Sequence, residues 1–155
     1  MTFWRFIHLL SMLLFVAGVG STVVSVWRAW LAQTVEEKAL SLQAAQGSHT
    51  MLLLPGIIAT LFTGYAWAAS AEYNVVTTGW LVALQVLTFV DLFIFVPLLG
   101  VGLRRVRILA LAAKKHGEVT PELKDALADN VPLVFGTLIV LTIPVMVWLP
   151  VFKPF

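Results

Sequence analysis

The sequence predicts an all-α fold, a transmembrane four-helix bundle, and three observations support that prediction. Of the 155 residues, 60% are hydrophobic and only 12% are charged, whereas soluble domains carry roughly 25% charged residues. The apolar residues gather in four runs, each about as long as the roughly 20 residues that cross a bilayer as a helix. Helices are expected because lipid offers no partners for backbone N–H and C=O groups, which must therefore pair within the segment.

The whole chain, residues 1–155, is predicted to form a single integral membrane domain. Its spans cover about residues 3–30, 50–69, 79–103 and 131–150. The first span resembles a signal peptide because Arg5 precedes an apolar run. However, the run from Ile7 to Trp27 is longer than the roughly 7–15 residues of a signal core, and no clear cleavage site follows it. We therefore expect the segment to be retained as the first span.

The connection between the first two spans has features of a helix. Thr34 and Glu37 match the T-x-x-E pattern of a capping box, in which side chains pair with the free N–H groups of the first helical turn. The apolar residues of this segment are Val35, Leu40 and Leu42. We expect a helical extension or a short interfacial helix with a partly apolar face that ends near Gly47.

The connection before the fourth span is the only strongly polar segment of the chain. Its first part is predicted to continue the third helix to His116, with Gly117 as the C-terminal cap. Thr120 is then expected to cap a new short helix that has Pro121 at its first position. Asn130 is expected to cap the fourth span.

Lysine and arginine residues are divided unevenly between the two sides of the predicted membrane domain. Eight lie on the side of the connections 31–49 and 104–130, and two, Arg5 and Lys153, lie on the side of the termini. Cytoplasmic loops of membrane proteins carry an excess of these residues. We therefore expect both termini on the outer (periplasmic) side of a bacterial inner (plasma) membrane, with both connections in the cytoplasm.

Asp91, within FVDLFIF (residues 89–95), is the only carboxylate inside a predicted span. At 1.5 Å per residue it lies about 18 Å from the outer end of its helix, near the midplane. An ionised carboxylate is costly there, so Asp91 should face the bundle interior. It is either a proton-handling group or the partner of an interhelical hydrogen bond, for which Thr60, Thr63 and Thr142 are candidates; the sequence leaves both interpretations open.

His8 and Met146 are the candidate cofactor-binding residues. His8 lies within the first two turns of the first span, and Met146 should lie at a similar depth because the fourth span runs back to the outer side. A histidine and a methionine can ligate haem iron. Alternatively, His8 is an interfacial histidine bonded to water or a carbonyl, and Met146 is a packing residue. His49 and His116 lie toward the cytoplasmic side, so one copy of the chain does not bracket a haem with two histidines.

Several classes of chemistry are not expected. The chain has no cysteine, which excludes disulfides, thiol catalysis and cysteine metal sites. It has no phosphate-binding loop, no histidine pair at metal-ligand spacing and no nucleophile beside a base, so we expect neither a metal site built from protein ligands alone nor a self-contained hydrolase. Arg104, Arg105 and Arg107 are expected to anchor the chain to lipid headgroups and not to bind nucleic acid.

Small residues and prolines indicate where helices pack closely or bend. The small residues of the first span are Ala17, Gly18, Gly20 and Ser21. They predict close packing against another helix, with a gap that lines a substrate path as the alternative. Pro55, Pro97 and Pro144 interrupt the second, third and fourth spans, and each predicts a kink.

Four fragments carry a resemblance to a known family. They are FWRFIHLLSMLLFVAG (3–18), LPGIIATLFTG (54–64), GWLVALQVL (79–87) and NVPLVFGTLIV (130–140), and the chain closes with VFKPF. In this order they resemble a bacterial four-helix integral membrane family of uncharacterised function, related to HemJ-type protoporphyrinogen oxidases and CopD-type copper-resistance membrane domains. The resemblance covers most of the chain.

The resemblance implies that His8 serves a haem, which would be haem b. It also implies a lysine soon after Trp80, where this chain has Leu84, and further histidines in the first and third spans that this chain lacks. The resemblance therefore supports haem binding through His8 more than it supports oxidase activity.

Three functions follow from the sequence. The first is a haem-binding or redox-associated membrane protein that uses His8 as ligand and a buried Asp91. The second is a non-catalytic accessory or assembly subunit of a membrane complex, such as a respiratory complex, in which Asp91 and the small residues contact partner helices. The third is a small transporter or copper-handling domain, which would need an oligomer to form a path. In each case the lipid bilayer is a partner.

Overall fold

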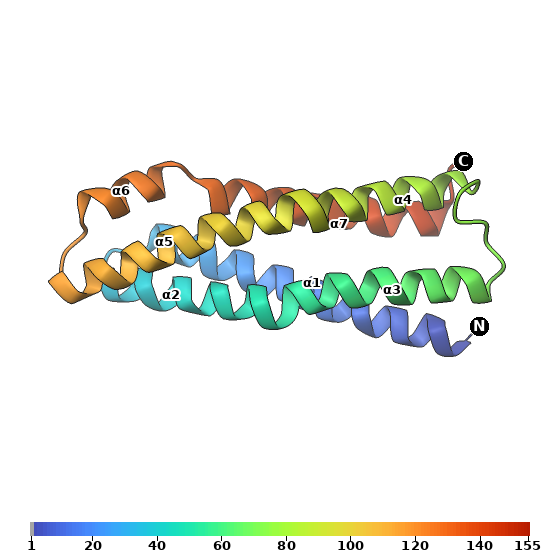
Figure 1. The fold of residues 1–155 in the computed structure, drawn as a ribbon, viewed down its shortest axis with the longest axis horizontal. Helices are drawn as coiled ribbons and strands as arrows, with labels where there is room; N and C mark the ends of the chain where they lie inside the picture. The colour runs from blue at the N-terminus through green and yellow to red at the C-terminus, as the bar shows by residue number, and fades with distance from the viewer. Residues whose placement is uncertain (1) are drawn as a thin grey trace.

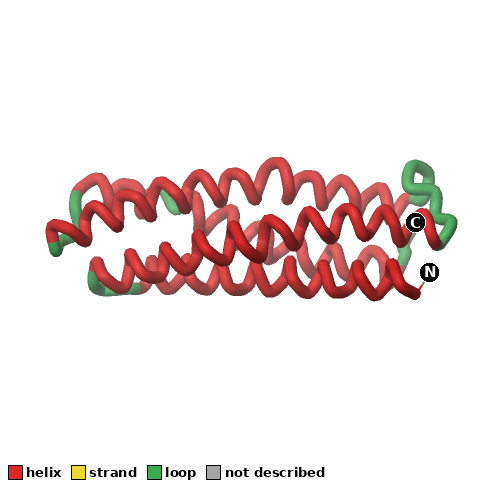
Figure 2. The backbone as a smooth tube through the Cα atoms, turned by 60° about the horizontal axis from the view of Figure 1, so that its bottom comes forward, coloured by secondary structure: helices red, strands yellow, loops and turns green. Residues whose placement is uncertain are grey.

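The computed structural model describes residues 2–155, apart from the side chain of Thr2, as a bundle of four long helical rods (Figures 1 and 2). The segments are α1 (Thr2–Leu31), α2 (Val35–Ser48), η1 (His49–Leu53), α3 (Leu54–Ser70), α4 (Gly79–Val90), η2 (Asp91–Phe95), α5 (Val96–His116), α6 (Pro121–Ala128) and α7 (Val131–Phe152). The segments η1 and η2 are π-helical turns that join α2 to α3 and α4 to α5, so each trio forms one continuous rod. Both ends of the chain lie at the same end of the bundle, which we call the terminal end (Figure 1).

The four rods are long and apolar enough to cross a membrane. By length and composition the candidate spans are Phe3–Leu31, Val35–Ser70, Gly79–His116 and Pro121–Phe152. These rods agree with the predicted helical membrane bundle. The second and third rods contain 36 and 38 residues, well beyond the roughly 20 that the hydrocarbon core requires, so we expect them to extend past it.

The second rod corrects two details of the prediction. The helix does not end near Gly47. It continues through this residue to Ser70, because a single glycine weakens a helix without ending it. Leu40 does not belong to the buried face and is 69% exposed. The buried residues of α2 are Val35, Ala39, Leu42 and Ala45, whose spacing of three and four residues forms one stripe.

The two π-helical turns explain how Pro55 and Pro97 fit inside continuous rods. The N–H of Leu54 bonds to the carbonyl of His49, and the N–H of Val96 bonds to the carbonyl of Asp91, each across five residues. A proline lacks its own N–H, and its ring crowds the carbonyl four residues earlier. A wider turn just before each proline accommodates this crowding.

Close backbone contact between α1 and the second rod depends on two glycines. A Cβ at Gly18 would collide with the backbone of Leu53, and a Cβ at Gly56 would lie 2.6 Å from the backbone of Phe15. A real Cβ does not approach a backbone atom so closely. The predicted close packing at Gly18 is therefore present, and it occurs within this chain.

The interior is packed unevenly along the bundle. One cluster of buried side chains joins α1, α2, α5 and α6 at the end away from the termini, where α2 packs on α5. At the terminal end α1 packs on α3 and α4 packs on α7. Figure 1 shows these two helix pairs spread apart there. In α4 the only buried residue is Trp80, so the terminal end has room between its two pairs of helices.

The helix ends largely follow the sequence, with one exception. Gly117 ends α5 in the left-handed conformation at φ 75°, and the Thr120 hydroxyl accepts from the N–H of Leu123 at 3.4 Å. Asn130 does not cap α7 with its side chain. Its carboxamide oxygen accepts instead from Trp30 Nε1 at 2.9 Å, so the side chain joins α1 to the start of α7.

Candidate functional site

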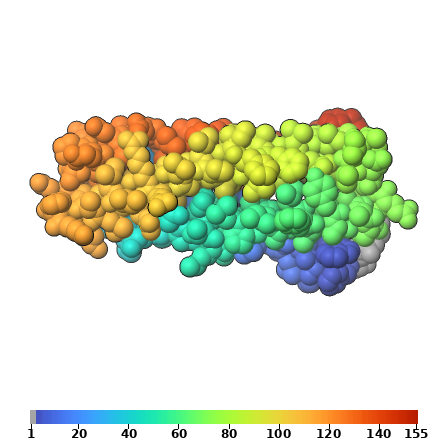
Figure 3. All heavy atoms as spheres, viewed as in Figure 1, coloured from blue at the N-terminus to red at the C-terminus, as the bar shows by residue number. Residues whose placement is uncertain are grey.

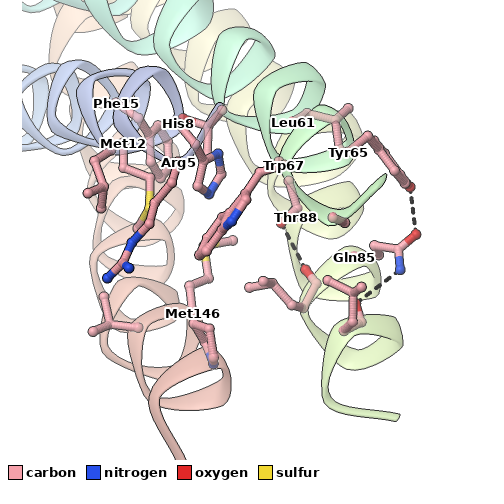
Figure 4. A pocket seen from close by; sticks show the side chains of 18 of the residues that line it. Arg5, His8, Met12, Phe15, Leu61, Tyr65, Trp67, Gln85, Thr88 and Met146 are labelled. Carbon is pink, nitrogen blue, oxygen red and sulfur yellow. Dashed lines mark hydrogen bonds between the residues drawn. The ribbon is translucent and has the colours of Figure 1, made fainter. Parts of the chain in front are cut away.

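A cavity of about 470 Å³ lies between the two helix pairs at the terminal end. Its walls come from α1, α3, α4 and α7 and from the loop between α3 and α4 (Figure 4). Ligand pockets in proteins usually span about 300–1,000 Å³ and combine an apolar lining with a few placed polar groups. The polar and charged groups here include Arg5, His8 and Gln85, so the cavity has the size and composition of a binding site.

His8 is buried in the wall formed by α1 and lies directly against α3. Its ring packs on Gly64, where a Cβ would come within 3.1 Å of the imidazole. The indole of Trp67 lies beside it, with ring centroids 5.5 Å apart. The missing side chain at position 64 and the aromatic neighbour together hold the imidazole at the cavity wall (Figure 4).

The hydrogen bonds of Thr63 indicate which nitrogen of His8 carries the proton. The Thr63 hydroxyl donates to the carbonyl of Ala59 at 2.6 Å, so its single proton is used there. His8 Nδ1 lies 3.1 Å from the same oxygen and must therefore donate. The neutral ring then presents Nε2 as a free lone pair, and among the residues that the structure describes nothing hydrogen-bonds to it.

The structure brings Met146 into the same cavity as His8. Both residues line it, together with Met12 one turn from His8 and with Leu84 on α4. Met146 is buried and packs in the apolar cluster that includes Phe15. The sequence placed Met146 at the depth of His8, and the shared cavity agrees with that placement.

Two polar contacts around the cavity were not anticipated from the sequence. Tyr65 donates to Gln85 Oε1 at 2.6 Å, which joins α3 to α4 (Figure 4). The Gln85 amide donates in turn to the carbonyl of Val75 at 2.8 Å. An isolated glutamine within the apolar run GWLVALQVL was the available signal, since a buried amide requires partners.

The C-terminal residues contact two lining residues of the cavity, Tyr73 and Trp80, at the terminal end. Lys153 donates to the hydroxyl of Tyr73 at 2.8 Å and lies over the rings of Tyr73 and Trp80, 5.2 and 5.6 Å from their centroids. The carbonyl of Phe155 accepts from the N–H of Trp80 at 3.2 Å. The ring of Phe155 also packs against Gly79, so the tail is fixed to the start of α4.

Asp91 lies outside the cavity, in the interior between the third rod and α7. The residue is fully buried, and its Oδ2 lies 2.7 Å from the hydroxyl of Thr142. Of the three threonines that the sequence suggested as partners, Thr142 is the one that contacts Asp91. Thr63 forms a hydrogen bond with His8 instead. Thr88, one turn before Asp91, lines the cavity, so the carboxyl is one helical turn away from the cavity wall.

His49 is a second buried histidine, which the sequence placed only at the start of a span. Its Nε2 lies 3.2 Å from the carbonyl of Val96, and its ring packs on Gly100. Its Nδ1 has no partner among the described residues. The histidine and Asp91 each begin a π-helical turn, and the wide turn directs each side chain inward.

Protein side chains alone do not form a metal centre in the described part of the chain. Residues 2–155 hold no group of three or more His, Asp or Glu side chains that could enclose an ion.

Comparisons with known proteins place the chain among membrane proteins. Residues 2–154 match the model of a family described as predicted integral membrane protein, DUF2269. No curated protein and no solved structure matches the chain significantly. The match covers nearly the whole sequence and agrees with the four apolar rods.

Proposed function

We propose that this chain, which belongs to the DUF2269 family of predicted integral membrane proteins, binds haem in a bacterial inner membrane and uses His8 as a ligand. The observation that carries the proposal is the hydrogen bonding of the His8 ring, which fixes one nitrogen and leaves the other free. Its Nδ1 is held by Thr63 at 3.1 Å, which leaves Nε2 available at the cavity wall. Metal-ligating histidines are usually fixed in this way by a hydrogen bond at the other ring nitrogen.

The cavity suits a flat, largely apolar cofactor. Its volume of about 470 Å³ and its aromatic and aliphatic walls match the requirements of such a ligand. Met146 lines the same space and would be the candidate second ligand, since histidine and methionine are both known haem ligands. A bound haem would supply one-electron redox chemistry. The chain would supply the imidazole that ligates the iron, hold this imidazole in its orientation and exclude water.

The charge distribution supports the orientation with both termini on the outer side. The terminal end carries Arg5 and Lys153, and the other end carries the clusters of α5 and the loop that follows. Arg105 there pairs with Asp129 at 2.7 Å, with both side chains largely exposed. Under the positive-inside rule the other end faces the cytoplasm, and the cavity lies in the outer half of the membrane.

An absorption spectrum of protein purified in mild detergent from haem-supplemented cells tests the proposal. We expect a Soret band that shifts when dithionite is added and that is lost in His8→Ala. The control is His116→Ala, because His116 is exposed at the end of α5 and its loss should leave the band unchanged. Met146→Leu should retain haem but alter the reduced spectrum.

A flat visible spectrum in haem-replete wild-type protein would overturn the proposal. A Soret band that survives in His8→Ala would overturn the role of His8. In the first case, co-purification of other membrane subunits would be the next measurement, because an accessory role is the main alternative.

A further inference from the structure

The exposed residues of the cavity wall are confined to two helices. Leu9 on α1 and Val147 on α7 both line the cavity, yet they remain 48% and 45% exposed. Arg5, Val16 and Val151 are also exposed and lie on the same two helices. A residue that is both exposed and part of the wall marks the mouth of a cavity, so this mouth lies between α1 and α7.

The other sides of the cavity carry no exposed lining residue in the described part of the chain. The hydrogen bond from Tyr65 to Gln85 spans the side between α3 and α4, and the residues of those helices that line the cavity are buried or half-buried. Figure 3 shows the face of the molecule on which the side chains of these two helices lie. At the terminal end, Tyr73 and Val75 of the loop after α3 line the cavity, and the tail at Lys153 bonds to Tyr73. The exposed lining residues therefore indicate a route that leads sideways between α1 and α7, into the hydrocarbon or its boundary.

Arg5 is the only lysine or arginine among the described residues that line the cavity. Arg5 lines the cavity and lies three residues before His8 on α1, so both occupy the same helix face. Arg5 forms no ion pair with any residue that the structure describes. Among residues 2–155 the one ion pair joins Arg105 to Asp129, at the other end of the bundle. Figure 4 shows its side chain extending from the ribbon of α1 toward that of α7. A guanidinium binds carboxylates and phosphates strongly.

From these observations we propose that the cavity opens laterally between α1 and α7 and takes its ligand from the bilayer, and that the ligand is an anionic amphiphile whose acidic group pairs with Arg5. This inference rests on the proposed function, because it assigns an access route and a ligand class to the same site. The apolar body lies against the walls, and the acidic group stays at the depth of Arg5 near the membrane surface.

The chain offers matched substitutions that test the lateral mouth. Leu9 and Leu10 are adjacent on α1 and are 48% and 47% exposed, but only Leu9 lines the cavity. Val147 and Val145 on α7 are 45% and 46% exposed, and only Val147 lines it. Leu9→Trp and Val147→Trp should obstruct the mouth, whereas Leu10→Trp and Val145→Trp should leave it open.

The measurement is the rate at which haemin passes from liposomes into the protein reconstituted in other liposomes, followed at the Soret band. We expect Leu9→Trp and Val147→Trp to slow loading and release about tenfold or more, with little change in final occupancy. The two control variants should load like the wild type. Equal rates for all four variants would overturn the lateral route.

Arg5 is tested with two forms of one cofactor. Arg5→Ala should weaken binding of haemin about two- to fivefold, the effect of losing one partly exposed ion pair. The dimethyl ester of haemin lacks the acidic groups, so its affinity should not change in this variant. An equal loss for both forms would overturn the ion pair.

A second measurement needs no haem and separates this inference from the proposed function. Because the chain has no cysteine, a nitroxide can be attached at Leu84→Cys inside the cavity. Collisions with oxygen report lipid, and collisions with a water-soluble nickel chelate report water. Phe62→Cys provides the lipid reference and Val76→Cys the aqueous reference, since these residues are 70% and 78% exposed on a rod and on a loop.

The expected result at position 84 is high oxygen and low nickel accessibility, and Leu9→Trp should reduce the oxygen value. A nickel accessibility equal to that at Val76 would mean that the cavity opens to water and would overturn the lateral mouth. Haemin that fails to bind the wild type would overturn the proposed function, while the nitroxide result would still decide the position of the mouth.

Discussion

The hydroxyl of Thr142 lies 2.7 Å from Asp91 Oδ2 and also 2.7 Å from the carbonyl oxygen of Ile139. A hydroxyl has one proton and can donate to only one of these two acceptors. If Asp91 is protonated, its O–H donates to Thr142, and Thr142 donates to Ile139. Both contacts are then satisfied, and no charge is buried. The geometry therefore favours a neutral carboxylic acid at position 91.

The first prediction concerns this proton. Infrared spectra of the wild type at neutral pH should contain the C=O band of a protonated carboxylic acid, which disappears in Asp91→Asn. Thr142→Val should move the band to higher frequency, because the acid loses its hydrogen-bond partner, and Thr142→Ser should restore it. A carboxylate band assigned to Asp91 at neutral pH would contradict the neutral form.

The second prediction concerns the contact between α1 and η1. Gly18→Ala should destabilise the protein by about 1–3 kcal/mol or more, because the new Cβ meets the backbone of Leu53, which cannot move aside as a flexible side chain could. Gly20→Ala has open space around its Cβ and should be neutral or stabilise by up to about 1 kcal/mol through helix propensity. Unfolding in detergent mixtures compares the two variants, and equal stabilities would contradict the close contact.

The third prediction concerns the support of His8. Thr63→Val removes the oxygen that accepts from Nδ1, so the ring loses its fixed tautomer and orientation. Affinity for haemin should fall about 10–100-fold, as is usual when the outer partner of a ligating histidine is removed. Thr63→Ser keeps the hydroxyl and should rescue binding. If valine and serine bind equally well, the hydrogen bond at 3.1 Å does not orient the ligand.

The fourth prediction concerns the C-terminal tail and its contact with Tyr73 and Trp80. Lys153→Met keeps an apolar stem but loses the bond to Tyr73 and the contact with both rings. A cation–π contact at such a site is worth about 0.5–1 kcal/mol. Hydrogen exchange in the loop 71–78 should therefore become roughly two- to fivefold faster. Lys114→Met at the opposite end is the control, and an unchanged loop in Lys153→Met would show that the tail does not fix it.

The sequence by itself determined that the chain forms four long apolar helices that could cross a membrane. Apolar runs of spanning length have few alternatives, since backbone groups in lipid must pair locally. Cap residues such as Gly117 and Thr120 could also be predicted, because a helix cap depends on residues that are close in the sequence. The buried position of Asp91 followed from the cost of a charge in hydrocarbon.

Only the tertiary structure decided which of these residues meet. The choice of Thr142 over two other threonines, the support of His8 by Thr63 and the mouth between α1 and α7 all depend on the rotation of whole rods. In lipid the outward and inward faces of a helix are both apolar, so the amphipathic pattern that fixes rotation in soluble bundles is weak. Gly18, Gly56, Gly64 and Gly100 set that rotation here, because only a face without a side chain admits a backbone or an imidazole.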